Sequence, residues 1–158
     1  MNATAGTVGV IELGHVVLYV RDAEASRAFY GDVLGWPVVA TITIGGARAV
    51  AFSAGRTHHE LLLIEVGPDA TPLPTGRRVG MYHFGIKIGD TDDDLRDMLR
   101  RLTDHHVTVV GTADHTITHS LYVLDPDGNE IELYTDVADI DWATNPDLIV
   151  APIRPLRL

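Results

Sequence analysis

The chain has 158 residues, of which 46% are hydrophobic and 22% are charged, a composition typical of one soluble globular domain. Its net charge of −10 argues against nucleic acid and anionic membranes as partners, because both attract basic surfaces. Cysteine is absent, so any metal site must use His, Asp or Glu.

The sequence offers no membrane or secretion signal. No apolar run approaches the roughly 20 residues needed to cross a bilayer. The N-terminus, MNATAGTVGVIELG, lacks the basic region and long apolar core of a secretory signal. We therefore expect a cytoplasmic protein with no membrane contact.

The first half of the chain predicts a strand, a helix and three more strands. Residues 13–20 form an apolar, β-branched run that is typical of a strand. Asp22 can cap a helix over Ala23–Leu34, and Gly35 is a natural stop. Three further strands are predicted at Pro37–Ile44, Arg48–Ser53 and Glu60–Val66. Turns at Gly45-Gly46 and Ala54-Gly55-Arg56 separate them.

The second half repeats this order after a linker rich in proline and glycine at 67–80. A strand is predicted at Tyr82–Ile88, and Thr91 and Asp94 resemble a capping box that opens a helix to about Thr103. Three strands are expected to follow, at Val107–Thr112, Ser120–Leu124 and Glu130–Thr135, with a hairpin turn at Asp125–Gly128.

The two halves are therefore predicted to be βαβββ modules of an α+β fold. Module one spans about 11–66, the linker 67–80, module two about 81–136 and a C-terminal tail 137–158. Neither module could bury both faces of its sheet alone, so we expect both modules in a single domain over 1–158. The tail is expected to wrap the domain or to contact another subunit.

Histidines and one glutamate stand at positions where they could form a site. His15 and His83 hold matching places in the two first strands. Alternation along a strand puts residues 13, 15, 17 and 19 on one face, so His15 is expected to point inward. An inward Glu132 would cost several kcal/mol unless it is paired or metal-bound.

The stretch from His115 to Glu132 reads H-T-I-T-H-S-L-Y-V-L-D-P-D-G-N-E-I-E. This spacing closely resembles the signature of type I extradiol ring-cleaving dioxygenases, in the vicinal oxygen chelate superfamily, with one mismatch at Ala113. The resemblance implies that the paired modules form a cupped, barrel-like mixed sheet around a metal. It also implies a small aromatic diol and O2 as substrates, and a homo-oligomeric assembly.

The resemblance further implies roles for individual residues. Two histidines and one carboxylate are the pattern of non-haem Fe(II) oxygenases, and Mn(II) is the alternative metal. The implied ligands are His15, His59 and Glu132. The implied partners beside them are His83 in the second shell, Tyr122 as hydrogen-bond donor to the bound substrate oxygen, and His115 as helper in oxygen binding or proton transfer.

Two alternatives stay open. Aligning His59-Glu60-Leu61 with Ile131-Glu132-Leu133 makes Glu60 the ligand from the last strand of module one, whereas an Arg-x-His-His run aligned on the dioxygenases favours His59, which we prefer. Many dioxygenases carry an acid/base histidine about 14 or 15 residues before the second metal ligand, and counted back from His59 this chain has Gly45 and Ile44 there. The alternative functions are therefore a glyoxalase-like lyase, isomerase or epimerase, and a metal-free small-molecule-binding protein.

Overall fold

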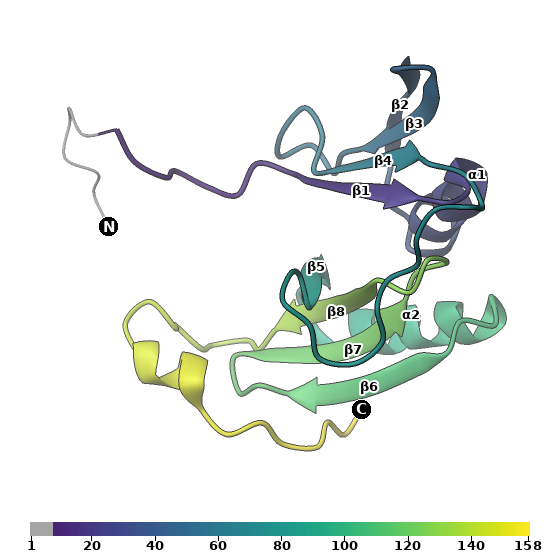
Figure 1. The fold of residues 1–158 in the computed structure, drawn as a ribbon. Helices are drawn as coiled ribbons and strands as arrows, with labels where there is room; N and C mark the ends of the chain where they lie inside the picture. The colour runs from purple at the N-terminus through teal and green to yellow at the C-terminus, as the bar shows by residue number, and fades with distance from the viewer. Residues whose placement is uncertain (1–7) are drawn as a thin grey trace.

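Two four-stranded sheets, each covered on one face by a helix, make up the protein in this computed structural model, which describes residues 8–158 (Figure 1). Module one contains β1 (Val16–Val20), α1 (Ala23–Arg27), η1 (Ala28–Val33), β2 (Val38–Ile44), β3 (Ala47–Phe52) and β4 (Leu61–Glu65). Its strand order is β1-β4-β3-β2, with β1 parallel to β4 and the other pairs antiparallel.

Module two repeats this topology. It contains β5 (His83–Gly89), α2 (Asp92–Asp104), β6 (Val109–Asp114), β7 (Thr118–Leu124) and β8 (Glu130–Asp136). The strand order is β5-β8-β7-β6, again with the first strand parallel to the last. The predicted α+β fold of paired βαβββ modules is confirmed, although the two sheets remain separate and do not close into a barrel.

The helix of module one differs from its prediction. One turn of α-helix passes into the π-helix η1, in which the amide of Leu34 donates to the carbonyl of Phe29. The wider π turn places Phe29 and Tyr30, two adjacent aromatic residues, both in the core. Gly35 ends the helix at φ +80°, as predicted from its tolerance of the left-handed region.

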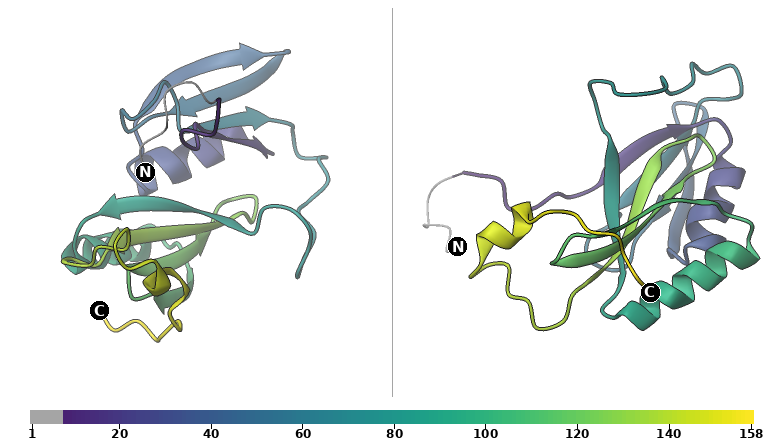
Figure 2. Two further views of the ribbon diagram at one scale, coloured as in Figure 1. Left: turned by 90° about the vertical axis from the view of Figure 1, so that its left-hand side faces the viewer. Right: turned by 90° about the horizontal axis from the view of Figure 1, so that it is seen from below.

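The helix of module two begins as predicted. Thr91 and Asp94 form the reciprocal capping box, and Leu95, Met98 and Leu102 are buried against the sheet. Together with residues of module one they belong to one hydrophobic cluster that runs through both modules. Figure 2 shows α1 and α2 on the same side of the molecule, which fits this shared core.

The tail contacts module two through a short bridge. Asp114 and Arg154 exchange both backbone hydrogen bonds, at 2.9 Å each, and the 3-10 helix η2 (Pro146–Val150) precedes this bridge. The tail thus pairs with the end of the edge strand β6. Among the helices of residues 8–158, none combines the length and the apolar character that a bilayer crossing requires.

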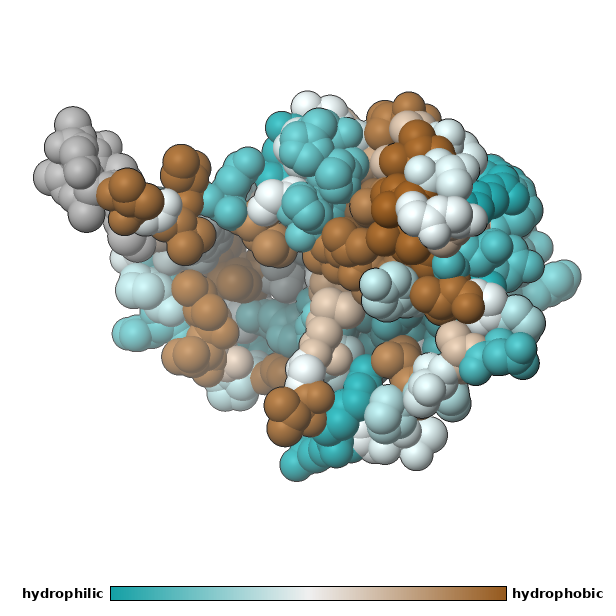
Figure 3. Space-filling view, turned by 45° about the horizontal axis from the view of Figure 1, so that its top comes forward, coloured by the Kyte–Doolittle hydropathy of each residue, from teal (hydrophilic) through white to brown (hydrophobic). Residues whose placement is uncertain are grey.

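Apolar side chains also reach the surface of module one. Val39 and Ile42 of the edge strand β2 are 52% and 46% exposed, and Val10 and Ile11 before β1 are almost fully exposed. Figure 3 shows apolar surface over the first sheet and along the N-terminal segment.

Candidate metal centre

Three strands of module two carry polar side chains on the face of the sheet that points away from α2. Leu121, Leu133 and their alternating neighbours are buried toward the helix, so Tyr122 and Glu132 project from the other face. The register pairs Glu132 with Tyr122 on one side and with Gly85 on the other. Alternation along β5 places His83 on this same face.

The two oxygens of the Glu132 carboxylate have different neighbours. Oε1 accepts hydrogen bonds from the Ser120 hydroxyl at 2.7 Å and from the Tyr122 hydroxyl at 3.1 Å. Oε2 lies 3.3 Å from Nε2 of His83. The side chain of Glu132 is only 16% exposed, and these polar contacts offset the desolvation of its charge.

Tyr122 links this carboxylate to His115. Its hydroxyl lies 2.8 Å from Nε2 of His115. Burial, followed by the neighbouring Glu132 carboxylate, holds the pKa of Tyr122 well above its ordinary value, so the phenol keeps its proton at neutral pH. The imidazole, phenol and carboxylate of the His115–Glu132 motif therefore form one continuous chain of contacts.

The two ring nitrogens of His83 have different surroundings. Nε2 faces Glu132, whereas the buried Nδ1 makes no hydrogen bond to any of residues 8–158 and lies 3.5 Å from Oε1 of Glu130. The rings of Tyr82 and Tyr122 pack edge-on against His83, with centroids at 4.6 and 5.6 Å. The sequence analysis predicted that His83 lies outside the ligand set, in the second shell. In the structure His83 lies directly against Glu132.

Module one contributes a separate group of three imidazoles. The His59 ring lies 4.5 Å from that of His15, and the Nδ1 atoms of His58 and His59 are 2.6 Å apart. Burial is the largest cause that lowers the pKa of His59, and the nearby His58 and His15 lower it further. His59 is thus held neutral, the form that binds metals.

Glu60 holds a loop together. Its carboxylate accepts hydrogen bonds from the backbone amides of Ala54, Arg56 and Thr57 at 2.6 to 3.2 Å. Burial is the largest single effect on the pKa of Glu60 and raises it, but these amides together bring it below its ordinary value. The carboxylate therefore closes the turn between β3 and β4.

The strand register also shows that the alignment of Glu60 with Glu132 is wrong. Val16 pairs with Leu61, so Glu60 stands level with His15, just as Glu130 pairs with His83. In module one the place of Glu132 is taken by Leu62, which pairs with Val17 as Glu132 pairs with Gly85. The repeat therefore gives no argument for Glu60 as a ligand.

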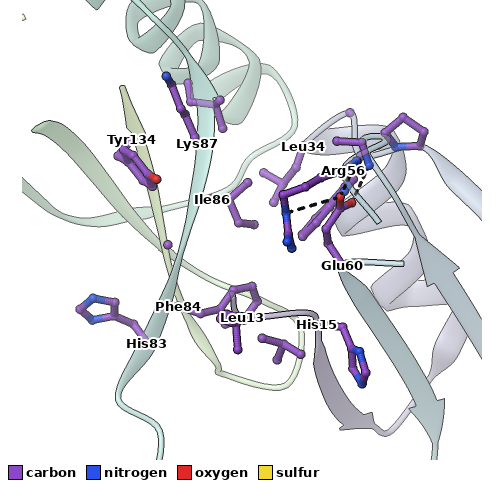
Figure 4. A pocket seen from close by; sticks show the side chains of 17 residues that line it. Leu13, His15, Leu34, Arg56, Glu60, His83, Phe84, Ile86, Lys87 and Tyr134 are labelled. Atoms are coloured by element: carbon purple, nitrogen blue, oxygen red, sulfur yellow. Dashed lines mark hydrogen bonds and ion pairs between the residues drawn. The ribbon is translucent and has the colours of Figure 1, made fainter. Parts of the chain in front are cut away.

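A cleft of about 760 Å³ separates the two groups of candidate ligands. His15, which immediately precedes β1 instead of lying within it, lines one wall, and His83 of β5 lines the other. Figure 4 shows Phe84 and Ile86 pointing into this cleft, whereas His83 points away from it on the opposite face of β5. The cleft interior is therefore largely apolar, with histidines at its borders.

The predicted trio of His15, His59 and Glu132 is not assembled. Within residues 8–158, no three His, Asp or Glu side chains stand close enough together to hold one ion. His59 lies with His15 in module one, and Glu132 lies with His83 in module two, because β1 and β5 are edge strands of separate sheets.

Two residues of this site were missed by sequence reasoning. Ser120 falls at an unspecified position of the motif, and Gly85 carries no side chain that a pattern could mark. Strand alternation alone could have found Ser120, since it stands two residues before Tyr122 and so shares its face.

Comparison with known proteins places this arrangement in a family. The model of the Glyoxalase/Bleomycin resistance protein/Dioxygenase superfamily matches residues 12–133. The chain is 35% identical over 136 residues to the catechol-2,3-dioxygenase of Bacillus subtilis (strain 168), covering 82% of this chain and 43% of that protein. It is 30% identical over 156 residues to the iron-dependent extradiol dioxygenase of Rhodococcus jostii (strain RHA1), covering 88% of this chain and 49% of that protein.

Among solved structures, lactoylglutathione lyase from Agrobacterium tumefaciens is similar, with a TM-score of 0.59 and 28% identity over 80% of this chain and 95% of that chain. The chain spans about half the length of the two curated relatives, so their whole activity is not carried over by similarity alone. The family model, in contrast, covers most of the chain. The chain belongs to the glyoxalase/bleomycin resistance protein/dioxygenase superfamily.

Proposed function

We propose that this protein is an Fe(II)-dependent extradiol dioxygenase that opens a small aromatic vicinal diol with O2, with Mn(II) as the alternative metal. The observation that carries the proposal is the pairing of Glu132 Oε2 with His83 Nε2 at 3.3 Å, beside the Tyr122 and His115 pair. The similarity to two proteins named as ring-cleaving dioxygenases supports it.

The donor atoms in module two suit such a metal. Within the described part of the chain, Oε2 of Glu132 accepts no hydrogen bond, and His83 presents Nε2 beside it, which gives one carboxylate and one imidazole donor. A second histidine completes the set that non-haem Fe(II) oxygenases use. We assign His15, across the cleft, as the second histidine ligand. His59 is then a neighbour of His15 and not a ligand. Completing the set requires His15 to reach the face of β5 that carries His83, which points away from the cleft.

The remaining residues have roles that follow from their positions. When bound, Fe(II) supplies a Lewis acid at which a diol and dioxygen can meet. Tyr122 keeps its proton and can donate a hydrogen bond to a substrate oxygen. His115 lies within hydrogen-bond distance of that phenol and can exchange a proton with it. Gly85 has no side chain, which lets the Tyr134 ring and Oε2 of Glu132 lie close against β5.

The activity can be tested directly. Protein loaded with Fe(II) under anaerobic conditions is mixed with a panel of catechols and air, and both oxygen uptake and the yellow ring-opened product are followed. We expect one O2 consumed per diol cleaved. Absence of turnover across the panel, with stoichiometric iron bound, would rule the proposal out.

The ligand assignment can be tested separately by Mn(II) titration of alanine variants. His83→Ala and His15→Ala are expected to lose the site, whereas His59→Ala should keep it. His105→Ala, at the exposed end of α2, is the control. Loss of binding in His59→Ala with retention in His83→Ala would restore the original trio of His15, His59 and Glu132.

A metal-dependent lyase or isomerase is the second candidate, favoured by the similarity to lactoylglutathione lyase. Such an enzyme works without O2. Turnover of a thiohemiacetal or an acyl-thioester substrate under anaerobic conditions would decide for this candidate.

A further inference from the structure

Ser120 is the hydroxyl donor with the least freedom near Glu132. Its side chain is fully buried, and its Oγ donates to Oε1 of Glu132 at 2.7 Å, the shortest hydrogen bond that this carboxylate makes in residues 8–158. No other acceptor shares this hydroxyl among those residues. A buried hydroxyl with a single charged acceptor has a defined orientation, because leaving that acceptor costs the full desolvation of both groups.

The position of Ser120 in the sheet explains how it reaches Glu132. In the antiparallel pair β7–β8, Tyr122 stands directly opposite Glu132, and Ser120 stands opposite Tyr134, two residues farther along. Ser120 is therefore the diagonal neighbour of Glu132 on the same face, within reach for a glutamate side chain that leans along the strand.

We propose that Ser120 is a positioning residue that fixes Oε1 of Glu132, so that Oε2 is presented to a divalent metal beside His83. This inference rests on the proposed function, since it assigns Glu132 as a metal ligand. A ligand carboxylate that is hydrogen-bonded on its other oxygen binds more tightly, because its orientation is set before the metal arrives.

Tyr122 cannot take over this task. Its hydroxyl is divided between Glu132 and His115, at 3.1 and 2.8 Å, and the proposed reaction also uses it toward the substrate. When Tyr122 turns to a substrate oxygen, Ser120 is the donor that remains on Oε1. The two hydroxyls therefore have different roles. Ser120 fixes the orientation of the Glu132 carboxylate, and Tyr122 donates a hydrogen bond to the substrate.

The test is the Mn(II) affinity of the apo protein, measured by electron paramagnetic resonance of free Mn(II), a readout independent of turnover. Ser120→Ala is expected to weaken binding about 10- to 100-fold, the range typical of lost outer-shell partners. Ser120→Thr keeps a hydroxyl and should retain most of the affinity. Ser26→Ala is the matched control, because Ser26 is equally buried but its Oγ has no hydrogen-bond partner among residues 8–158.

The outcomes separate this inference from the proposed function. Equal Mn(II) affinity in wild type and Ser120→Ala overturns the role of Ser120, and so does an equal weakening in Ser120→Ala and Ser26→Ala. Wild type without any Mn(II) or Fe(II) binding overturns the proposed function first. Thermal unfolding of each apo variant checks the fold, and if Ser120→Ala does not fold, Ser120→Cys, a weak donor of similar volume, is judged by the same criterion.

Discussion

The hydroxyl of Tyr30, in the π-helix of module one, donates a 2.9 Å hydrogen bond to Oδ2 of Asp125, in the last turn of module two. Both residues are buried. The same carboxylate accepts hydrogen bonds from the amides of Asp127 and Asn129, so it also shapes the turn that leads into β8. Arg21 of module one pairs with Asp127 at 3.2 Å. Module one thus anchors the turn that sets the position of Glu132.

We expect Tyr30→Phe to destabilise the protein by about 1–3 kcal/mol, because Asp125 would lose a donor in a buried place. Urea unfolding measures this free energy. Tyr19→Phe is the control, since Tyr19 is 72% exposed, and its change should stay within about 0.5 kcal/mol. Equal stabilities of the two variants would show that the bond between the modules contributes nothing.

The pKa of Glu60, lowered by three backbone amides against the effect of burial, predicts an acid-dependent loss of stability. A carboxyl with a lowered pKa in the folded state stabilises fully above its ordinary value of 4.5, and this contribution is lost as the pH falls through the folded-state value. Wild type should therefore exceed Glu60→Gln in unfolding free energy at pH 6, and the difference should shrink below pH 4.5. A difference that is constant from pH 6 to pH 3 would contradict this assignment.

Tyr122→Phe should lower kcat for diol cleavage by about 10²- to 10⁴-fold, the usual effect of losing a proton donor. Its Mn(II) affinity should change little, because Ser120 still donates to Glu132. Steady-state oxygen uptake and the Mn(II) titration give the two quantities. An unchanged kcat would remove Tyr122 from the reaction, while a large loss of Mn(II) affinity would assign it to the metal site.

Gly85→Ala should raise KM for the diol by about tenfold through crowding, since overpacking costs about 1–3 kcal/mol. A Cβ there would lie 3.2 Å from Cε1 of Tyr134 and 3.6 Å from Oε2 of Glu132. Gly111→Ala adds a Cβ at an ordinary 3.5 Å from the Tyr122 ring and serves as the control. If both variants keep the wild-type KM, crowding of Tyr134 and Glu132 at Gly85 does not affect binding of the diol.

Much of the fold could be predicted from local patterns. The capping box at Thr91, the stop at Gly35 and the hairpin turn closed by Gly128 follow from side-chain and backbone preferences of single residues. The repeat of strand order follows from apolar alternation. The π turns of η1 were not predictable, because they depend on how Phe29 and Tyr30 pack in the core that both modules share.

The site was predicted in part. The motif placed His115, Tyr122 and Glu132 in contact because its spacing spans one hairpin, whose register is fixed by the turn. The contact of His83 with Glu132 was not predicted, because His83 reaches Glu132 through the parallel pairing of β5 and β8, which joins distant parts of the chain. Residue patterns along one strand carry no information about such a pairing.

The separation of β1 and β5 into different sheets has an energetic consequence for any ligand that both modules share. The position of His15 relative to Glu132 is set by side-chain packing and by the Tyr30–Asp125 bond, without a backbone ladder between the two edges. A ligand that contacts both modules would cross-link them. The free energy needed to bring the modules together would weaken the binding of that ligand. Substitutions in the core between the modules, far from the site, should therefore change the affinity of the site for such a ligand.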